Sequence, residues 1–218
     1  MVHTITRRTR AAKPRWQRRK QARPGEIVAA ALEVFAERGF AATKLEEVAR
    51  RAGVTKGTLY LYFDSKEALF KAVVRETIVP TIAQGEALAQ SFTGSARELF
   101  ARMVRDFWQR IGGTPLAGIP KLMMAEAANF PDLARFYYDE VVRRGHRLLG
   151  MVVERGISSG EFRPVDVAAA VRLAIAPLLW AANWQHSFAL CTREGFDVAT
   201  YLDSHIDIFL RGIAKRPT

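Results

Sequence analysis

Hydrophobic residues recur at helical spacing along most of the chain. The first such series follows Pro24 and consists of Ile27, Ala30, Ala31, Val34 and Phe35. This i, i+3, i+4, i+7, i+8 pattern places all five side chains on one face of a helix. Pro24 stands where a first-turn proline belongs and Gly39 where a C-terminal glycine belongs, so a helix of about three turns is predicted.

Three further helices are predicted before residue 80. The second opens at the Thr43–Glu46 segment, which has the Thr-x-x-Glu spacing of a capping box, and ends at Gly53. Thr55 is a suitable N-cap for a very short third helix, from Lys56 to about Tyr62. Ser65 caps a fourth helix, which Pro80 is expected to end or kink.

The rest of the chain also has helical periodicity, interrupted by breakers. These are the turn at residues 112–115, Pro131, and the Ser-Ser-Gly segment at residues 158–160. Two strongly apolar helices are expected near residues 165–190 and 197–215. No clear run of alternating β-branched residues occurs. The pattern therefore predicts an all-α fold of about nine or ten helices.

The second and third predicted helices form a helix-turn-helix motif. Gly53-Val54-Thr55 is the tight turn between them, and Leu59 fills the space between the two helices. The outer face of the third helix carries Lys56, Gly57, Thr58, Tyr60 and Tyr62. Exposed aromatic rings beside hydrogen-bond donors suit the major groove of DNA. The alternative is an ordinary surface helix of a helical bundle.

Charge is unevenly distributed along the chain. Lys and Arg total 33 against 22 Asp and Glu, which gives a formal net charge of +11. The first 25 residues contain no acidic residue and many bases: Arg7, Arg8, Arg10, Lys13, Arg15, Arg18, Arg19, Lys20 and Arg23. This segment suggests a polyanionic partner. The alternative is a solvated tail with no specific role.

Composition excludes several other classes of protein. A single cysteine, Cys191, cannot form an intrachain disulfide or a multi-cysteine metal site. The four histidines have no metal-ligand spacing, and neither a metal nor a cofactor is expected. The basic N-terminus lacks the apolar segment of a secretory signal. The apolar stretch at residues 173–182 contains Pro177 and is far shorter than a membrane span, so a cytoplasmic protein without membrane contact is expected.

The segment from Thr43 to Leu69 is similar to the DNA-binding domain of the TetR family of bacterial transcriptional regulators. It matches at nearly every signature position, including the Tyr-x-Tyr-Phe-x-x-Lys run that starts at Tyr60. The resemblance implies a three-helix DNA-binding head and a linking fourth helix. It also implies a larger helical C-terminal domain for dimerisation and ligand binding. Five residues would then hold phosphates: Thr43, Lys44, Thr55, Tyr62 and Lys66. Four would approach base edges: Lys56, Gly57, Thr58 and Tyr60.

The expected organisation follows from the motif and the charge pattern. Residues 1–23 form a basic, disordered arm, residues 24–80 the DNA-binding head, and residues 81–218 the effector-binding and dimerisation domain. The candidate pocket residues are Phe107, Met123, Glu126, Trp180 and Trp184. The alternative is that the apolar residues belong mostly to the core and that Glu126 is a hydrogen-bonded residue between packed helices. The expected effector is a small apolar or aromatic molecule.

The leading hypothesis is therefore a homodimeric repressor, not an enzyme. It would bind an inverted repeat in double-stranded DNA and be released by an effector in the C-terminal domain. In the dimer, the last two helices would pair with their symmetry mates. One alternative is an enzyme or small-molecule carrier, but no nucleophile–base pair, phosphate loop or metal cluster supports it. The other is an architectural DNA-binding protein without effector or sequence preference.

Overall fold

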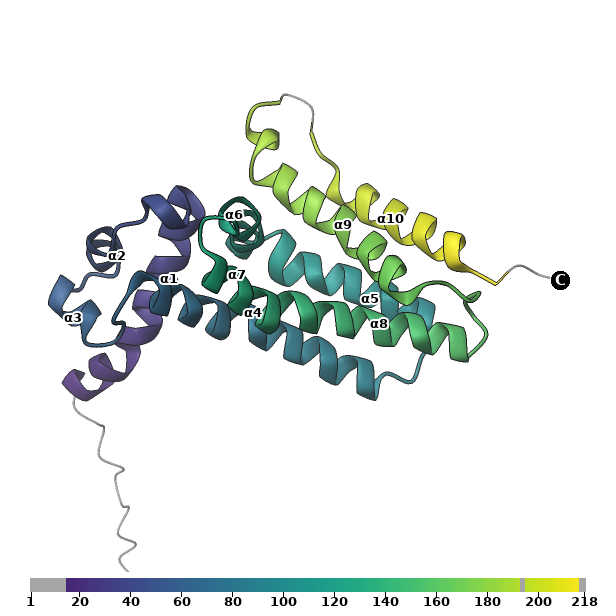
Figure 1. Ribbon diagram of the computed structural model, residues 1–218, viewed down its shortest axis with the longest axis horizontal. Helices are drawn as coiled ribbons and strands as arrows, with labels where there is room; N and C mark the ends of the chain where they lie inside the picture. Colours follow the sequence, from purple (N-terminus) through teal and green to yellow (C-terminus); the bar gives the residue numbers. More distant parts are fainter. Residues whose placement is uncertain (1–14, 193–194, 216–218) are drawn as a thin grey trace, which may run out of the picture.

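The computed structural model describes residues 15–192 and 195–215, and within this part ten α-helices and no strand occur. The all-α prediction is confirmed. Helices α1 (Arg15–Ala42), α2 (Leu45–Arg51) and α3 (Lys56–Tyr60) gather at one end of the molecule, which we call the head. Helix α4 (Lys66–Ser91) begins in the head and continues into the second part, which we call the body (Figure 1).

The body is a bundle built around α4. Helix α8 (Arg143–Ser158) packs against α4 and against α5 (Ala96–Phe107), and α9 (Val167–Gln185) packs against α8 and α10 (Val198–Ile213). The short helices α6 (Gly118–Glu126) and α7 (Pro131–Tyr137) lie where body and head meet (Figure 1). Two π-helical segments, η1 (Trp108–Gly112) and η3 (Tyr138–Val142), continue α5 and α7. Two 3₁₀ turns, η2 (Pro115–Ala117) and η4 (Phe188–Leu190), complete the fold.

Local signals in the sequence located most helix boundaries of the head. Thr55 and Ser65 are N-caps of α3 and α4 as predicted, and their side chains accept hydrogen bonds from the backbone nitrogens of Thr58 and Ala68. Gly53 has a positive φ of 66°, the left-handed conformation that a tight turn after α2 requires.

The predicted capping box at α2 is wrong. Helix α2 begins at Leu45, and its N-cap is Lys44, whose side chain makes no capping hydrogen bond. Thr43 lies one residue too early, and its hydroxyl instead donates a hydrogen bond to the carbonyl of Gly39 at 2.6 Å.

The two prolines expected near helix boundaries both lie inside helices. Helix α1 begins at Arg15 and not at Pro24, because the preceding residues are mainly Arg, Lys, Gln and Ala, which favour helix. Only residues 1–14 of the predicted arm lie outside the described residues. Helix α4 continues past Pro80, an exposed residue, where the carbonyl that loses its partner can be hydrated. Buried Ile78 and Ile82 hold the helix on either side of it.

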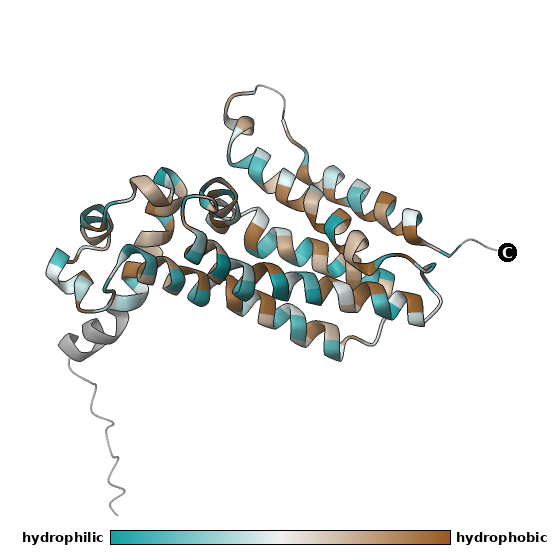
Figure 2. Cartoon of the chain, viewed as in Figure 1, coloured by the Kyte–Doolittle hydropathy of each residue, from teal (hydrophilic) through white to brown (hydrophobic). Residues whose placement is uncertain are grey.

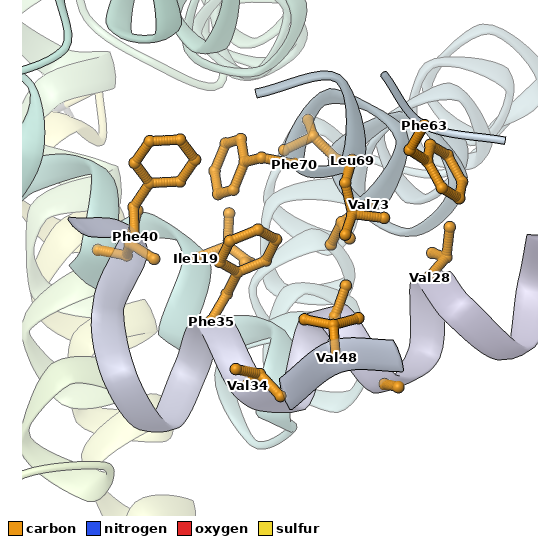
Figure 3. Close-up of a cluster of buried hydrophobic side chains, with 14 of the residues drawn as sticks. Val28, Val34, Phe35, Phe40, Val48, Phe63, Leu69, Phe70, Val73 and Ile119 are labelled. Carbon is orange, nitrogen blue, oxygen red and sulfur yellow. The ribbon is translucent and has the colours of Figure 1, made fainter. Parts of the chain in front are cut away.

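A single aromatic cluster joins the head to the body. The ring of Phe40, near the end of α1, contacts Phe35, Phe70 of α4 and Phe130 before α7, with centroids 5.7, 5.6 and 4.8 Å apart. Ile119 of α6 belongs to the same buried core (Figure 3). The core of the head is therefore completed by residues of the body.

Helix α9 is more apolar than predicted. Over an 18-residue window its mean hydropathy is 1.4, and by length and composition alone it could cross a membrane. Only a third of that window is buried. Hydrophobic residues recur along both α9 and α10 (Figure 2). The expectation that this segment is too short for a membrane span is therefore not met, and its exposed apolar face needs another explanation.

The buried His205 of α10 generates a prediction about stability. Its ring lies against Phe100 and Phe209, and its Nε2 has no hydrogen-bond partner. Burial lowers the pKa of His205 below its ordinary value. The unfolded chain takes up a proton below about pH 6.5, whereas the folded chain resists it. The contribution of His205 to the free energy of unfolding is therefore fully present above about pH 6.5. It is lost progressively as the pH falls from there toward the lower pKa of the folded state.

We predict that His205→Phe removes this contribution to the pH dependence. The loss in the free energy of unfolding, bounded by about 1.4 kcal/mol per pH unit below pH 6.5, should be smaller in the variant. Urea unfolding of both proteins at pH 7.5, 6.5 and 5.5 measures the difference, and the other titrating groups, which both proteins share, contribute equally. If the free energy of unfolding changes with pH in the same way in both proteins, His205 is not a source of this pH dependence.

Candidate functional site

Helix α3 presents a polar, partly aromatic surface at the tip of the head. Leu59 is fully buried, and four residues later Phe63 is also in the core. This spacing turns the opposite side of the segment outward, where Tyr60 is 42% and Leu61 82% exposed. The sequence reasoning missed Leu61, although its position between Leu59 and Phe63 already indicated an outward side chain.

Gly57 lies on the same surface, and no contact within the protein requires a glycine there. A Cβ atom at this position would have the Thr55 hydroxyl oxygen as its nearest neighbour, at 3.9 Å. Glycine inside a helix costs about 1 kcal/mol relative to alanine. Packing within the protein therefore does not account for a glycine at this position.

Lys56 is held by a neighbour on α2. Its ammonium group forms an ion pair with Glu46, and it lies 5.8 Å from the centre of the Tyr60 ring. The hydrogen bond with Glu46 raises the pKa of Lys56, and the same bond lowers the pKa of Glu46. Both side chains are more than half exposed, so this ion pair exchanges readily with other partners.

Two residues expected to hold phosphates are engaged within the protein. Thr43 is only 3% exposed, and its hydroxyl is bonded to Gly39. The Lys66 ammonium donates to the carbonyls of Ala41 and Thr43 at 2.9 and 3.2 Å, and it lies over the Phe40 ring. Both residues therefore stabilise the connection between α1 and α2. The sequence could not indicate this, because the partners of Lys66 lie more than twenty residues away.

The body contains a large apolar cavity of about 630 Å³. Its wall is formed by side chains of α4, α5, η1, α6, α7, η3, α8 and α9. Of the five predicted pocket residues, Phe107 and Met123 line it. Most of the remaining wall is aliphatic or aromatic, as in pockets that bind apolar molecules.

The other three predicted pocket residues lie elsewhere. Trp180 and Trp184 stack on each other near the end of α9, with ring centroids 5.4 Å apart, because Ala174 and Leu178 occupy the face of α9 turned toward the cavity. Glu126 lies at the last turn of α6 and faces the head instead.

Glu126 connects α6 to the end of α1. One carboxylate oxygen accepts a hydrogen bond from the backbone nitrogen of Ala41 at 3.3 Å, and the other accepts one from the Asn129 amide at 3.1 Å. At the other end of α6, a Cβ atom on Gly118 would lie 2.8 Å from the Ala36 side chain, so the two helices are in very close contact. Helix α6 therefore has the cavity on one side and the head on the other.

Polar groups are few around the cavity. Arg110 donates to the Gln84 side chain at 2.6 Å, and Arg102 forms an ion pair with Asp106 at 2.9 Å. Tyr137 is nearly buried, and burial raises the pKa of its hydroxyl. The sequence reasoning missed Tyr137, because nothing in the periodicity of α7 distinguishes a cavity wall from a closed core.

No group of three or more potential metal ligands occurs within the described part of the chain.

Two family profiles match the chain. The profile described as bacterial regulatory proteins of the TetR family matches residues 27–73, which contain the helix-turn-helix. The profile described as the C-terminal domain of tetracycline-repressor-like proteins matches residues 92–189, which contain most of the cavity wall.

Related sequences agree with both profiles. The chain is 25% identical over 200 residues to a fatty acid metabolism regulator protein of Bacillus subtilis, covering 90% of this chain and 100% of the relative. It is 28% identical over 198 residues to the transcriptional repressor KstR2 of Rhodococcus jostii, covering 90% and 93%. Both relatives are regulators, and the family is not enzymatic.

Among solved structures, the fold is similar to that of the transcriptional regulator FadR from Bacillus subtilis in complex with stearoyl-CoA. The TM-score is 0.72 at 23% identity, over 87% of this chain and 98% of that one. The helix-turn-helix, the helical body and the two matching profiles lead to one conclusion: the chain belongs to the TetR family of bacterial transcriptional regulators.

Proposed function

We propose that this protein is a homodimeric cytoplasmic repressor, which binds an inverted-repeat DNA operator and is released by a largely apolar effector. The observation that carries the proposal is the exposed face of α3, which has polar and aromatic groups and an otherwise unexplained glycine. This face has the size and chemistry to enter the major groove. A relative that is named as a repressor supports repression rather than activation of transcription.

The proposed DNA contacts follow the exposed residues of the head. Lys56, Gly57, Thr58 and Tyr60 approach base edges, whereas Lys44, Thr55 and Tyr62 contact the backbone. Thr43 and Lys66 act indirectly, because their polar groups hold the α1–α2 connection in place. At Thr43 and Lys66 the proposal therefore differs from the family resemblance, which implies direct phosphate contacts for both residues.

The exposed faces of α9 and α10 support dimerisation. Leu173 and Trp180, two turns apart on α9, are 67% and 49% exposed, and Ile208 of α10 is 71% exposed. Ala169 and Ala176 are exposed on α9 as well, and small residues let helices approach closely. Pairing with a second copy would cover this surface, and it explains the apolar character of α9 without a membrane.

The cavity supports an apolar effector. Its wall is mainly hydrocarbon, and one relative is named for fatty acid metabolism while a similar structure holds stearoyl-CoA. A long acyl chain has the chemistry that such a wall accepts. We therefore propose a fatty acyl compound as the first effector to test.

Effector binding would reach the head through α6. Met123 lines the cavity, and Glu126, three residues later, holds the backbone nitrogen of Ala41. A ligand that displaces α6 would therefore move the end of α1 and the adjacent helix-turn-helix. Such a ligand changes DNA affinity only as far as it binds one arrangement of the heads better than the other.

The first prediction concerns sequence recognition. Selection of fragments bound by the full chain from random double-stranded DNA should yield an inverted repeat, with half-site centres about one helical turn apart. Tyr60→Ala should then weaken binding to the selected sequence about 5- to 30-fold and change binding to random DNA less than twofold. Fluorescence anisotropy with both DNAs measures the ratio.

Lys44→Ala is the matched comparison. Loss of a phosphate contact should weaken both DNAs alike and lower the salt slope by about 1. If selection yields no common sequence, or if Tyr60→Ala weakens both DNAs equally, α3 is not the recognition element and the architectural alternative is favoured.

The second prediction concerns the dimer. Leu173→Glu places a charge in the proposed interface and should raise the dimer dissociation constant at least about 100-fold, because an unpaired buried charge costs several kcal/mol. Sedimentation equilibrium measures this constant. Leu61→Glu, at an exposed leucine of the head, is the control and should remain dimeric. Equal dissociation constants for wild type and Leu173→Glu would exclude this interface.

The third prediction concerns the connection through α6. With stearoyl-CoA as the probe, Glu126→Ala should bind the probe within about twofold of wild type but lose most of the probe-induced fall in DNA affinity. We expect a loss of about fivefold or more, the lower end of typical allosteric coupling. Glu154→Ala, on an exposed turn of α8, is the control. Unchanged coupling in Glu126→Ala would show that the signal takes another route.

A further inference from the structure

Tyr137 places a hydroxyl group at the boundary between the cavity and the core of the head. It is the last residue of α7, is 8% exposed, and packs within the same buried core as Ile119 and the phenylalanine rings of the head. It also lines the cavity. Tyr137 therefore takes part in both the hydrophobic core and the cavity wall.

The hydroxyl of Tyr137 makes no hydrogen bond within the described part of the chain. Burial alone raises its pKa, with no contribution from a hydrogen-bond partner. Among the described residues, the one buried side-chain polar atom that is both sealed from all open space and unpartnered is His205 Nε2. The Tyr137 oxygen is therefore reached by open space, and Tyr137 is one of the residues that line the cavity.

The arginines of the wall already have partners within the protein. Arg110 is bonded to Gln84, Arg102 is bonded to Asp106, and both arginines are exposed at the rim. Thr81 donates its hydroxyl to the carbonyl of Thr77. His146 also lines the cavity, but it is only partly buried, and burial lowers its pKa, which keeps it uncharged near neutral pH. Tyr137 is therefore the polar group of the wall that is nearly buried and has no hydrogen-bond partner in the described part of the chain.

We infer that Tyr137 is the specificity-determining residue of the cavity, and that the effector carries a neutral oxygen acceptor, such as a carbonyl, within an otherwise apolar frame. This inference rests on the proposed function of the cavity and deepens it. A phenolic hydroxyl has one strong donor, which an ether, ester or ketone oxygen of the ligand can accept. A pure hydrocarbon would leave the donor buried without a partner.

An ionised group does not fit at this position. A carboxylate beside Tyr137 would be buried among apolar side chains, because the arginines of the wall are engaged at the rim and the lowered pKa of His146 keeps it uncharged near neutral pH. Burial of an unpaired charge is far more costly than burial of a neutral hydrogen-bonded oxygen. The ligand atom that Tyr137 binds is therefore uncharged, whatever group the effector carries at the rim.

The backbone around Tyr137 also differs from a regular helix. The π-helical segment η3 follows it directly, and the second π-helical segment, η1, also contributes Arg110 and Ile111 to the wall. Such segments are frequent at functional sites because they redirect side chains within a helix. The placement of Tyr137 at the start of η3 agrees with a role in ligand recognition.

A matched pair of probes tests this inference. The ketone 2-acetylnaphthalene and the hydrocarbon 2-ethylnaphthalene have nearly the same shape, and only the first has an oxygen acceptor. Binding to the full-length protein is measured by calorimetry or by naphthalene fluorescence. We expect wild type to bind the ketone at least fivefold more tightly than the hydrocarbon. Tyr137→Phe should weaken ketone binding about tenfold, the loss of one hydrogen bond, and leave hydrocarbon binding unchanged or tighter, because no donor is then buried without a partner.

The controls separate this inference from the proposed function. Tyr201→Phe removes a tyrosine hydroxyl that is bonded to the Pro177 carbonyl outside the cavity, and it should change neither affinity. Circular dichroism and the melting temperature confirm that Tyr137→Phe is folded. If Tyr137→Phe leaves the preference for the ketone intact, the inference is overturned while the cavity remains a binding site. If wild type binds neither probe, the proposed apolar ligand site fails, and the inference fails with it.

Discussion

The structure depends on the contact between Phe40 and the three rings around it. Phe40 comes from α1, Phe70 from α4 and Phe130 from the segment before α7, so the cluster ties the head, the linking helix and the body together. Ile119 of α6 closes the same core (Figure 3). Because protein interiors are close-packed, none of these elements can shift while the others keep their positions. The orientation of the DNA-binding head is therefore fixed by residues of the body.

The same packing relates the cavity to the head. Met123, Ile78 and Tyr137 belong to the core that contains the phenylalanine cluster, and each also lines the cavity. A ligand in the cavity therefore touches side chains that directly support the head. This continuity is spatial, and it becomes regulation only where the packed elements have two arrangements that the ligand distinguishes. The hydrogen bond from Ala41 to Glu126 adds a directional contact at the point where α1 ends and the helix-turn-helix begins.

The sequence predicted many of the features that depend on neighbouring residues, although the capping box at α2 and the helix start at Pro24 were wrong. The caps at Thr55 and Ser65, the turn at Gly53 and the inward face of α3 all follow from short-range spacing, and the structure has them. Assignments that depend on distant partners were less accurate. Lys66 seemed free for a phosphate because the carbonyls it binds lie more than twenty residues away, at the end of α1 and in the connection to α2. Aromatic and acidic side chains are common in pockets, which is why Trp180, Trp184 and Glu126 were predicted there. The helix faces that carry these three residues are turned away from the cavity.

Charge pairing within the head explains why net charge is a poor guide to its specificity. Arg38 pairs with Glu47, Arg51 with Glu37, and Lys56 with Glu46, at the surface of the head. Surface ion pairs contribute little to stability, so a phosphate or a base edge can replace a carboxylate at small cost. The acids nevertheless reduce the non-specific attraction that unpaired bases would exert on any DNA. In the proposed complex, discrimination between sequences then depends on neutral groups such as Tyr60 and Thr58, whose hydrogen bonds would form only where the base edges match.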